Sequence, residues 1–418
     1  MSILADLLNT VFERRYRFGL ARQDDRPFED LTADLIGATG EVTGQAVARQ
    51  LLDRYEGWSD ADRLAFFRHL ATAMDVQPEA VRAALAAYEE APGKASYRAF
   101  AAAAEPPRQE LIRRLNMVPG ATHLLVRMRA DLLRLGRGEE ALMALDLDFR
   151  HLFASWFNRG FLVLRPISWE SPAAILEKII AYEAVHAIDS WDDLRRRLQP
   201  ADRRCFAFFH PAMPDEPLIF VEVALTQGVA SSVQALLAED RTVRPADQAD
   251  TANFYSISNC QAGLAGISFG NSLIKQVAAD LSQALPGLKT FVTLSPMPGF
   301  ARWLADRELS ADGMTETQLR QLGAHYLTRA KRPDGQPLDP VARFHLGNGA
   351  LVHALNAGAD ISPKGLGQSH GLMVNYLYDL ARVSQNHERF AAAQEVAMSG
   401  EVRGLTSAAE SALKETTE

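Results

Sequence analysis

Ser295 is the first residue whose surroundings suggest chemistry. It follows the apolar run 290–294 and precedes Pro296. A serine at the end of a strand lies where open α/β sheets bind ligands, but a serine before a proline is also a common helix cap. The pattern alone favours the cap. The surrounding residues do not form the G-x-S-x-G motif of hydrolases, so a hydrolase triad has little support.

His345, within the run 343–350, is the second candidate. Histidine titrates near neutral pH and is the usual proton donor or acceptor in catalysis. From the pattern alone, a packed core histidine is the more common explanation. His353 lies eight residues further on, which is too sparse a spacing for a metal site, and we expect no metal ligands.

A glycine-rich segment, 260–271, lies between a predicted strand and a predicted helix. It contains Gly263, Gly266 and Gly270. Glycines let backbone N–H groups approach a ligand, and the next helix would present its unpaired N–H groups and positive dipole end, so a pyrophosphate could bind here. A tight turn with close helix packing is an equally good explanation. The spacing is neither G-x-G-x-x-G nor a P-loop.

The polar segment 367–376 leads into Tyr378, for which we favour a place in the core. His210 ends a predicted strand next to Pro211, and such a histidine is more often structural than functional.

The elements that must position these residues differ along the chain. Up to about residue 155, apolar residues recur at three- and four-residue spacing and prolines mark helix starts, which predicts an all-helical bundle. Strand-length apolar runs then follow at 160–166, 205–210, 218–225, 253–258 and 290–294.

Between these strands we predict a hairpin turn at 214–217 and a long helix at about 267–285. After about residue 315 the chain is predicted to be mainly helical. The sequence thus predicts a helical domain, 1–157, followed by an α+β or α/β domain, 158–418, with a central mixed sheet flanked by helices.

Composition excludes several classes of protein. The net charge of −8 argues against a nucleic-acid partner. Cys205 and Cys260 are the only cysteines, which fits a reducing compartment. The sequence contains no apolar stretch of the ~18 residues expected of a membrane span, no secretory signal and no C-terminal Ser-Lys-Leu, so we expect a cytoplasmic protein.

Several motifs, taken together and in order, resemble those of the malonyl-CoA decarboxylase family over about residues 150–385. The matching runs are WFNRGFL (156–162), EAVH (183–186), FYSIS (254–258), GLAG (263–266) with Gly270 and LIK (273–275), LSPMPGF (294–300), FHLGNGA (344–350) and GLMVNY (371–376).

The resemblance implies a helical N-terminal domain that mediates oligomerisation, commonly as a homotetramer, and a catalytic domain with the GNAT acyltransferase fold. It implies decarboxylation of malonyl-CoA to acetyl-CoA and CO2 without a metal or other cofactor. The family's catalytic serine and histidine fall on Ser295 and His345. Its CoA-binding segment falls on Ala265, Gly266, Ile267, Ser268, Phe269, Gly270 and Asn271. The usual acetyltransferase phosphate loop is degenerate here, as Cys260-x-x-Gly263-x-Ala265.

Such a reaction leaves a thioester enolate, so the site must stabilise an oxyanion and supply a proton to carbon. We expect His345 to donate the proton and Ser295 to hold the carboxylate or the thioester oxygen. Two alternatives stay open: an acyl-CoA-dependent N-acyltransferase of the GNAT type, and a non-catalytic regulator that binds acyl-CoA.

Overall fold

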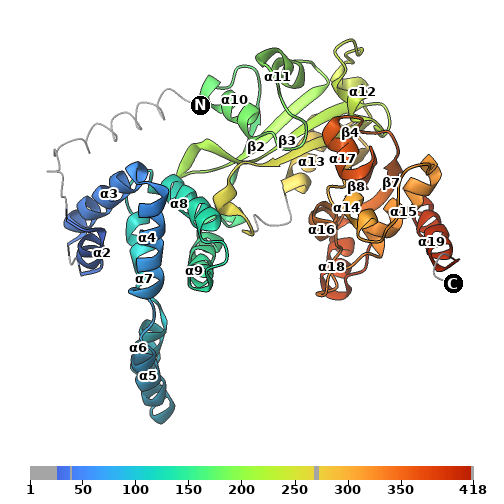
Figure 1. Cartoon of the computed structure of the whole chain (residues 1–418). Coiled ribbons are helices and arrows are strands. Elements are labelled where there is room, and N and C mark those ends of the chain that lie inside the picture. The colour runs from blue at the N-terminus through green and yellow to red at the C-terminus, as the bar shows by residue number, and fades with distance from the viewer. Residues whose placement is uncertain (1–25, 38–39, 268–272, 416–418) are drawn as a thin grey trace. The chain divides into compact units, whose positions relative to one another are not determined.

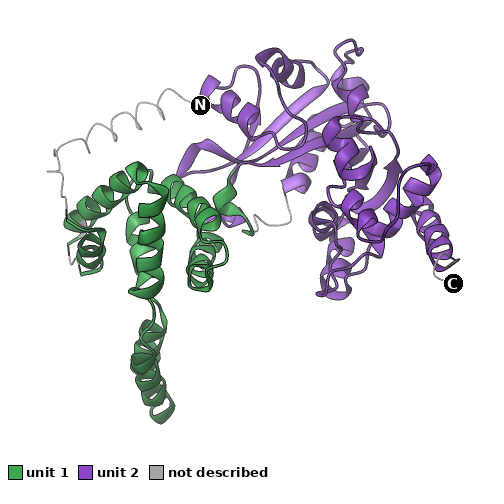
Figure 2. Cartoon of the chain, viewed as in Figure 1, with its two compact units in different colours: residues 1–156, 261–267 green, residues 157–260, 268–418 purple. Residues whose placement is uncertain are grey.

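The computed structural model describes residues 26–37, 40–267 and 273–415, which form two compact units (Figure 2). Unit 1 comprises Met1–Trp156 and Gln261–Ile267, and unit 2 comprises Phe157–Cys260 and Ser268–Glu418. The units divide one residue before the predicted domain boundary. The segment Gln261–Ile267, which lies within the second predicted domain, packs in unit 1.

The described residues of unit 1 form helices joined by turns and include no strand, as predicted. Its α-helices are α2 (Phe28–Gly37), α3 (Glu41–Gly57), α4 (Asp60–Thr72), α5 (Pro78–Glu90), α6 (Lys94–Ala104), α7 (Pro107–Asn116), α8 (Ala121–Leu135) and α9 (Glu140–Trp156). Prolines begin α5 and α7, where the missing N–H costs nothing. Ser59 begins α4 with a capping box to Asp62.

Within unit 1, α5 and α6 form a helical hairpin that extends away from the other helices (Figure 1). Neither helix has a buried residue. The two helices contact each other through aromatic rings, including Tyr88 and Phe100, whose centroids lie 6.3 Å apart. Leu85 and Tyr97 are exposed. The hairpin is therefore an amphipathic pair of helices with little support from the rest of the unit.

Unit 2 is built around one mixed sheet. Its strands are β1 (Val163–Ile167), β2 (Arg203–His210), β3 (Met213–Thr226), β4 (Thr251–Asn259), β5 (Thr290–Thr293), β6 (Ser295–Pro296), β7 (Leu351–Asn356) and β8 (Met373–Leu377). The order is β1-β2-β3-β4-β5-β8-β6, and β7 pairs with β8. Among the described strands only the β4–β5 pair is parallel.

Helices cover this sheet, as the sequence predicts (Figure 1). They are α10 (Ala173–Tyr182), α11 (Trp191–Leu198), α12 (Val233–Leu237), α13 (Leu273–Ala284), α14 (Phe300–Ala305), α15 (Glu316–Thr328), α16 (Pro340–Gly347), α17 (Pro363–Ser369), α18 (Val383–Ala393) and α19 (Gly400–Glu415). The largest core packs α13–α16, α18 and α19 on one side of the sheet, and smaller cores contain residues of α10, α11 and α12. The described helices are all too short or too polar to cross a bilayer.

One sequence prediction for unit 2 is wrong. The predicted hairpin turn at 214–217 lies inside β3, and β2 turns into β3 at residues 211–212. The prolines are accommodated because the β2–β3 register shifts there, so that Phe209 pairs with Pro217. The region after residue 315 is mainly helical, as predicted, and contains in addition the two short strands β7 and β8.

The sheet opens next to Ser295. The parallel ladder between β4 and β5 ends at the pair Phe254 and Thr293, and the Leu294 N–H adds one bond to the Phe254 carbonyl. β4 nevertheless continues to Asn259, paired only with β3. A bulge at Glu222/Val223 shifts the β3–β4 register at the same level. The strand that carries Ser295 thus separates from β4 where the candidate site begins.

Candidate active site

Ser295 lies in a strand, and its interpretation as a helix cap is wrong. Ser295 pairs with Val374 and Pro296 with Met373, so both belong to β6 beside β8. The next helix, α14, begins only at Phe300. The Ser295 side chain is buried, with the residue 5% exposed. A short strand at the opening of the sheet therefore fixes its position.

His345 is carried by α16, fifty residues further along the chain. Asp339 caps this helix by accepting the N–H groups of Val341 and Ala342, and Pro340 occupies its first position. His345 lies in the last turn on the buried side of the helix and is 2% exposed. It is a core histidine, as the pattern alone suggests, but it also faces Ser295.

Four polar side chains form one hydrogen-bonded chain. Ser295 Oγ lies 3.1 Å from His345 Nε2 and donates to Thr293 Oγ1 at 2.8 Å. His345 Nδ1 lies 2.9 Å from the hydroxyl of Tyr378. The chain thus runs from Tyr378, after the end of β8, through α16 to β6 and β5.

The direction of these hydrogen bonds follows from counting protons. Ser295 has one hydroxyl proton and gives it to Thr293, so its oxygen must accept from His345 Nε2. A neutral imidazole carries one ring proton, so Nδ1 then accepts from Tyr378. Each hydrogen bond of this series is therefore donated in the direction that leads from Tyr378 to Ser295. This is the reverse of a serine made nucleophilic by a histidine base.

Burial keeps His345 neutral. Removal from water lowers the pKa of His345 to about 3, and no neighbouring charge contributes to this shift. The imidazole stacks on the ring of Tyr376, with centroids 4.4 Å apart, which fixes its plane. Burial also raises the pKa of the Tyr378 hydroxyl. At neutral pH the hydrogen-bonded chain therefore consists of uncharged groups.

Sequence reasoning brought Ser295 and His345 together through a family motif but missed Tyr378 and Thr293. Tyr378 was assigned to the core, and it is indeed 1% exposed. The signal that could have identified it is the pair of tyrosines at alternate positions, 376 and 378, at the end of a short apolar run. By contrast, His210 supports the β2–β3 turn, because its Nδ1 accepts the N–H of Ala212.

The predicted CoA segment is only partly described. Ala265, Gly266 and Ile267 belong to unit 1, whereas Ser268, Phe269, Gly270 and Asn271 lie outside the described residues. Arg129 of α8 holds this segment by donating to the carbonyl oxygens of Gly263 and Ala265 at 2.7 and 2.9 Å.

Gly263 is required for that packing. A Cβ there would lie 1.8 Å from the carbonyl oxygen of Val126 on α8. Arg129 is itself buried and paired with Asp146. The interpretation of this glycine as a close-packing residue therefore fits unit 1, and a binding role for the segment stays a prediction.

Two family models together match most of the chain. The malonyl-CoA decarboxylase C-terminal domain matches residues 160–318 and 307–416, and the malonyl-CoA decarboxylase N-terminal domain matches residues 74–157. Among curated proteins, the mitochondrial malonyl-CoA decarboxylase of Anser anser anser is 34% identical over 359 residues, which is 72% of this chain and 70% of the relative. The Mus musculus protein of the same name is 30% identical over 97% of this chain and 91% of its own length.

Solved structures give the same result. The malonyl-CoA decarboxylase of Rhodopseudomonas palustris is 47% identical and that of Agrobacterium vitis is 49% identical. Each aligns with a TM-score of 0.85, over 90% of this chain and 98% of the solved chain. The similarity thus extends through both units.

Proposed function

This chain belongs to the malonyl-CoA decarboxylase family, and we propose that it converts malonyl-CoA to acetyl-CoA and CO2 with Ser295 and His345 as its catalytic residues. In enzyme terms it would be a carboxy-lyase. The observation that carries the residue assignment is the 3.1 Å contact between Ser295 Oγ and His345 Nε2, two buried groups from elements fifty residues apart.

The direction of the hydrogen-bonded chain suits protonation of carbon. Loss of CO2 breaks the bond between the carboxylate and the α-carbon and leaves an enolate of the thioester. In our proposal Ser295, and not His345 as expected from the sequence, donates directly to carbon: the enolate replaces Thr293 as the acceptor of the Ser295 proton. Ser295 then takes the Nε2 proton of His345, and His345 takes the proton of Tyr378. One proton from solvent restores Tyr378, so each turnover consumes one proton.

Neutral donors are adequate for this step. An enolate carbon is a far stronger base than the serine alkoxide or the tyrosine phenolate. Protonation of this carbon by the hydrogen-bonded side chains is therefore thermodynamically favourable. No imidazolium is required, which agrees with the low pKa of His345. A buried site without fixed charge also favours decarboxylation, because the carboxylate loses its hydration on entry and its charge spreads over the enolate.

We also propose that Ala265–Asn271 holds part of the CoA moiety. Support comes from Arg129, which fixes the backbone ahead of Gly266 by bonding two carbonyl groups. Gly266 has a φ of +74°, a conformation that favours glycine and turns the chain sharply. Backbone N–H groups at such a turn can bind a pyrophosphate without a basic side chain.

A product assay tests the proposed activity. Purified protein is supplied with malonyl-CoA and no amine acceptor, and CO2 and acetyl-CoA are measured. We expect both products in equal amounts. Release of CoA only after an amine is added would support an N-acyltransferase, and binding without turnover would support a regulator; either result would contradict the proposal.

The remaining proposals concern assembly and location. We propose a homotetramer formed through unit 1, supported by the exposed apolar side chains of the α5–α6 hairpin. We propose a cytoplasmic location, supported by the two cysteines, which are buried and not joined in a disulfide. The curated relatives named above are mitochondrial proteins.

A further inference from the structure

The candidate catalytic pair depends on one contact between two segments that are far apart in the chain. Ser295 belongs to β6 and His345 to the last turn of α16, and Ser295 Oγ lies 3.1 Å from His345 Nε2. A proton passes between two such groups only while they stay within hydrogen-bond distance. The helix α16 must therefore be held against the Ser295 segment at a second point.

Asp339 provides a second point of attachment. One oxygen of its carboxyl group accepts the N–H groups of Val341 and Ala342 at 2.9 Å each, which caps α16. The other oxygen accepts the hydroxyl of Tyr326 at 3.1 Å. The carboxyl also accepts the N–H of Gly299, the N-cap residue of α14. A single, fully buried side chain thus joins the beginning of α16 to the beginning of α14.

The contact between Gly299 and Asp339 closes a ring that contains the catalytic pair. Three residues separate Ser295 from Gly299, and two of the three are prolines, whose φ angles are fixed. From Asp339 the chain enters α16 directly and reaches His345 within that helix. The ring therefore consists of a proline-stiffened segment, a helix and two non-covalent contacts. Because both segments are stiff, a displacement at Gly299 and Asp339 is transmitted to Ser295 and His345.

Gly299 allows this close approach because it has no side chain. A Cβ at this position would lie 2.4 Å from the hydroxyl oxygen of Tyr326. The buried ring of Tyr326 packs on Phe300 and Trp303 of α14, with centroids 5.6 and 5.4 Å apart. Tyr326 is therefore fixed between α14 and Asp339, and a larger residue at 299 would displace it.

Asp339 lies close behind the catalytic histidine without changing its charge. Burial raises the pKa of the Tyr376 hydroxyl, and Asp339 adds to this increase. The ring of Tyr376 stacks on His345. Burial alone, however, accounts for the low pKa of His345. Burial also raises the pKa of the Asp339 carboxyl, against the hydrogen bonds that it accepts. The influence of Asp339 on His345 is therefore one of position.

We propose that Asp339 is a positioning residue, which holds α16 against the segment that follows Ser295 and so sets the distance between Ser295 and His345. The proposal rests on the proposed function, since this distance affects turnover only if the two residues move the proton. A residue that aligns the proton path without contacting the substrate should act on kcat rather than on KM.

Asp339→Asn tests the proposal. The two lone pairs of the amide oxygen can still accept from Val341 and Ala342, so α16 keeps its cap. The amide NH2 group cannot accept from Tyr326 or Gly299, so the connection to α14 is lost. We expect kcat to fall at least about tenfold, with KM for malonyl-CoA close to that of the wild type. An unchanged kcat would overturn the proposal.

A double-mutant cycle separates positioning from general loss of structure. In His345→Asn the contact with Ser295 is already absent, so adding Asp339→Asn should lower kcat little further. An equal loss in both backgrounds would overturn the proposal, because Asp339 would then only stabilise the fold. Tyr326→Phe keeps the ring and removes one donor to Asp339, and we expect a smaller loss of kcat. If Asp339→Asn does not fold, an unchanged kcat in Tyr326→Phe would overturn the proposal.

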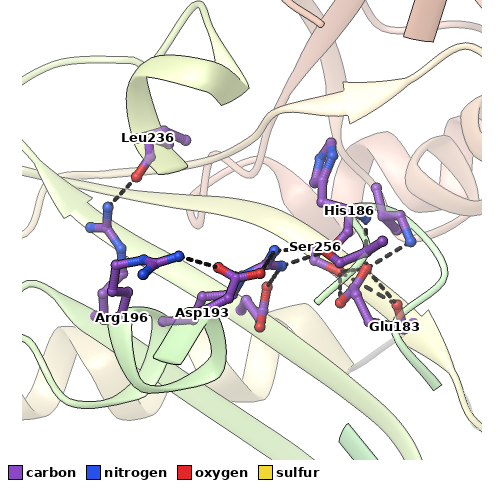
Figure 3. Close-up of polar contacts among 12 residues, drawn as sticks. Glu183, His186, Asp193, Arg196, Leu236 and Ser256 are labelled. Carbon is purple, nitrogen blue, oxygen red and sulfur yellow. Dashed lines mark hydrogen bonds and ion pairs between the residues drawn. The ribbon is translucent and has the colours of Figure 1, made fainter. Parts of the chain in front are cut away.

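The matched control is Asp193→Asn, which makes the same substitution at a carboxylate of α11. Asp193 accepts hydrogen bonds from Arg197 at 3.3 and 3.0 Å and faces Arg196 (Figure 3). We expect a lower melting temperature with wild-type kcat. Failure of the proposed function would be seen separately, as absence of CO2 release by the wild-type protein.

Discussion

Unit 2 contains two buried polar clusters that are built in opposite ways. The chain of Tyr378, His345, Ser295 and Thr293 contains only neutral groups at neutral pH. The cluster beneath residues 183–187 instead contains the charged guanidinium of Arg197, placed beside Glu222, and both residues are buried. Charge is thus used where a segment must be held, and is kept away from the groups that would handle the enolate.

The two histidines of these regions show the same contrast. Burial lowers the pKa of both, to about 3 for His345 and to about 4 for His186. For His345 burial is the only cause. For His186, Asp360 opposes the effect of burial, while Arg197 and Lys364 add to it. Both imidazoles are therefore neutral, but charged groups affect the pKa of His186, whereas burial alone sets that of His345.

The largest expected effect comes from breaking the series of hydrogen bonds between neutral side chains at Ser295 and His345. Ser295→Ala and His345→Asn should each reduce kcat by at least about 10²-fold, because each interrupts the path of the proton. The double variant should have a kcat no lower than that of the less active single variant, because the two residues act as a unit. Steady-state assays with malonyl-CoA measure kcat, and CoA affinity should be retained.

A matched control for Ser295 is Ser399→Ala, which removes the hydroxyl that donates to the carbonyl oxygen of His353 at 2.7 Å. We expect normal turnover. Near-normal turnover of purified Ser295→Ala or His345→Asn would contradict the assignment of the catalytic pair.

Two neighbouring tyrosines allow a sharper test of the chain's direction. Tyr378→Phe removes the donor to His345 Nδ1, and we expect kcat to fall about tenfold, the usual effect of losing one buried hydrogen bond at a reacting group. Tyr376→Phe removes a hydroxyl that has no partner among the described residues and retains the ring stacked on His345. Its kcat should change far less. Equal losses in the two variants would show that packing, and not the hydrogen bond, matters.

The sequence predicted much of this site because its signals are local. Prolines and caps marked helix starts, and the run 290–294 was correctly predicted as the strand before Ser295. The interpretation of Ser295 as a cap failed because a two-residue strand has almost no signal of its own. β6 exists only through its pairing with Met373 and Val374, nearly eighty residues away.

The same limit explains why Tyr378 was missed. Its burial agrees with an apolar pattern, and nothing local shows that its hydroxyl meets a histidine thirty-three residues earlier. The segment 183–187 is a similar case. Its motif was recognised at 183–186, but the side chains that hold it come from α11, β4 and α17. Contacts between distant elements, rather than local spacing, determine these positions.

The cluster of Arg197 and Glu222 should affect stability rather than turnover. Burial, with a further contribution from Glu183, raises the pKa of Glu222 to about 8, although Arg197 opposes the shift. The folded protein therefore holds a proton that the unfolded chain releases near the ordinary glutamate pKa of 4.5. Stability contributed by this proton is complete below that value and is lost as pH rises toward about 8.

Glu222→Gln should remove this dependence, because an amide of the same shape does not titrate. We expect the melting temperature of the wild-type protein to fall more between about pH 6 and about pH 8.5 than that of Glu222→Gln, measured by calorimetry. Glu216→Gln, which removes a carboxylate paired with Lys178 outside this cluster, should follow the wild type. Parallel curves for wild type and Glu222→Gln would mean that Glu222 is ionised throughout.

Over the same pH range kcat/KM for malonyl-CoA should show no step near the ordinary histidine pKa, because His345 stays neutral. A step there would show that His345 titrates, and would remove the contrast between the two clusters.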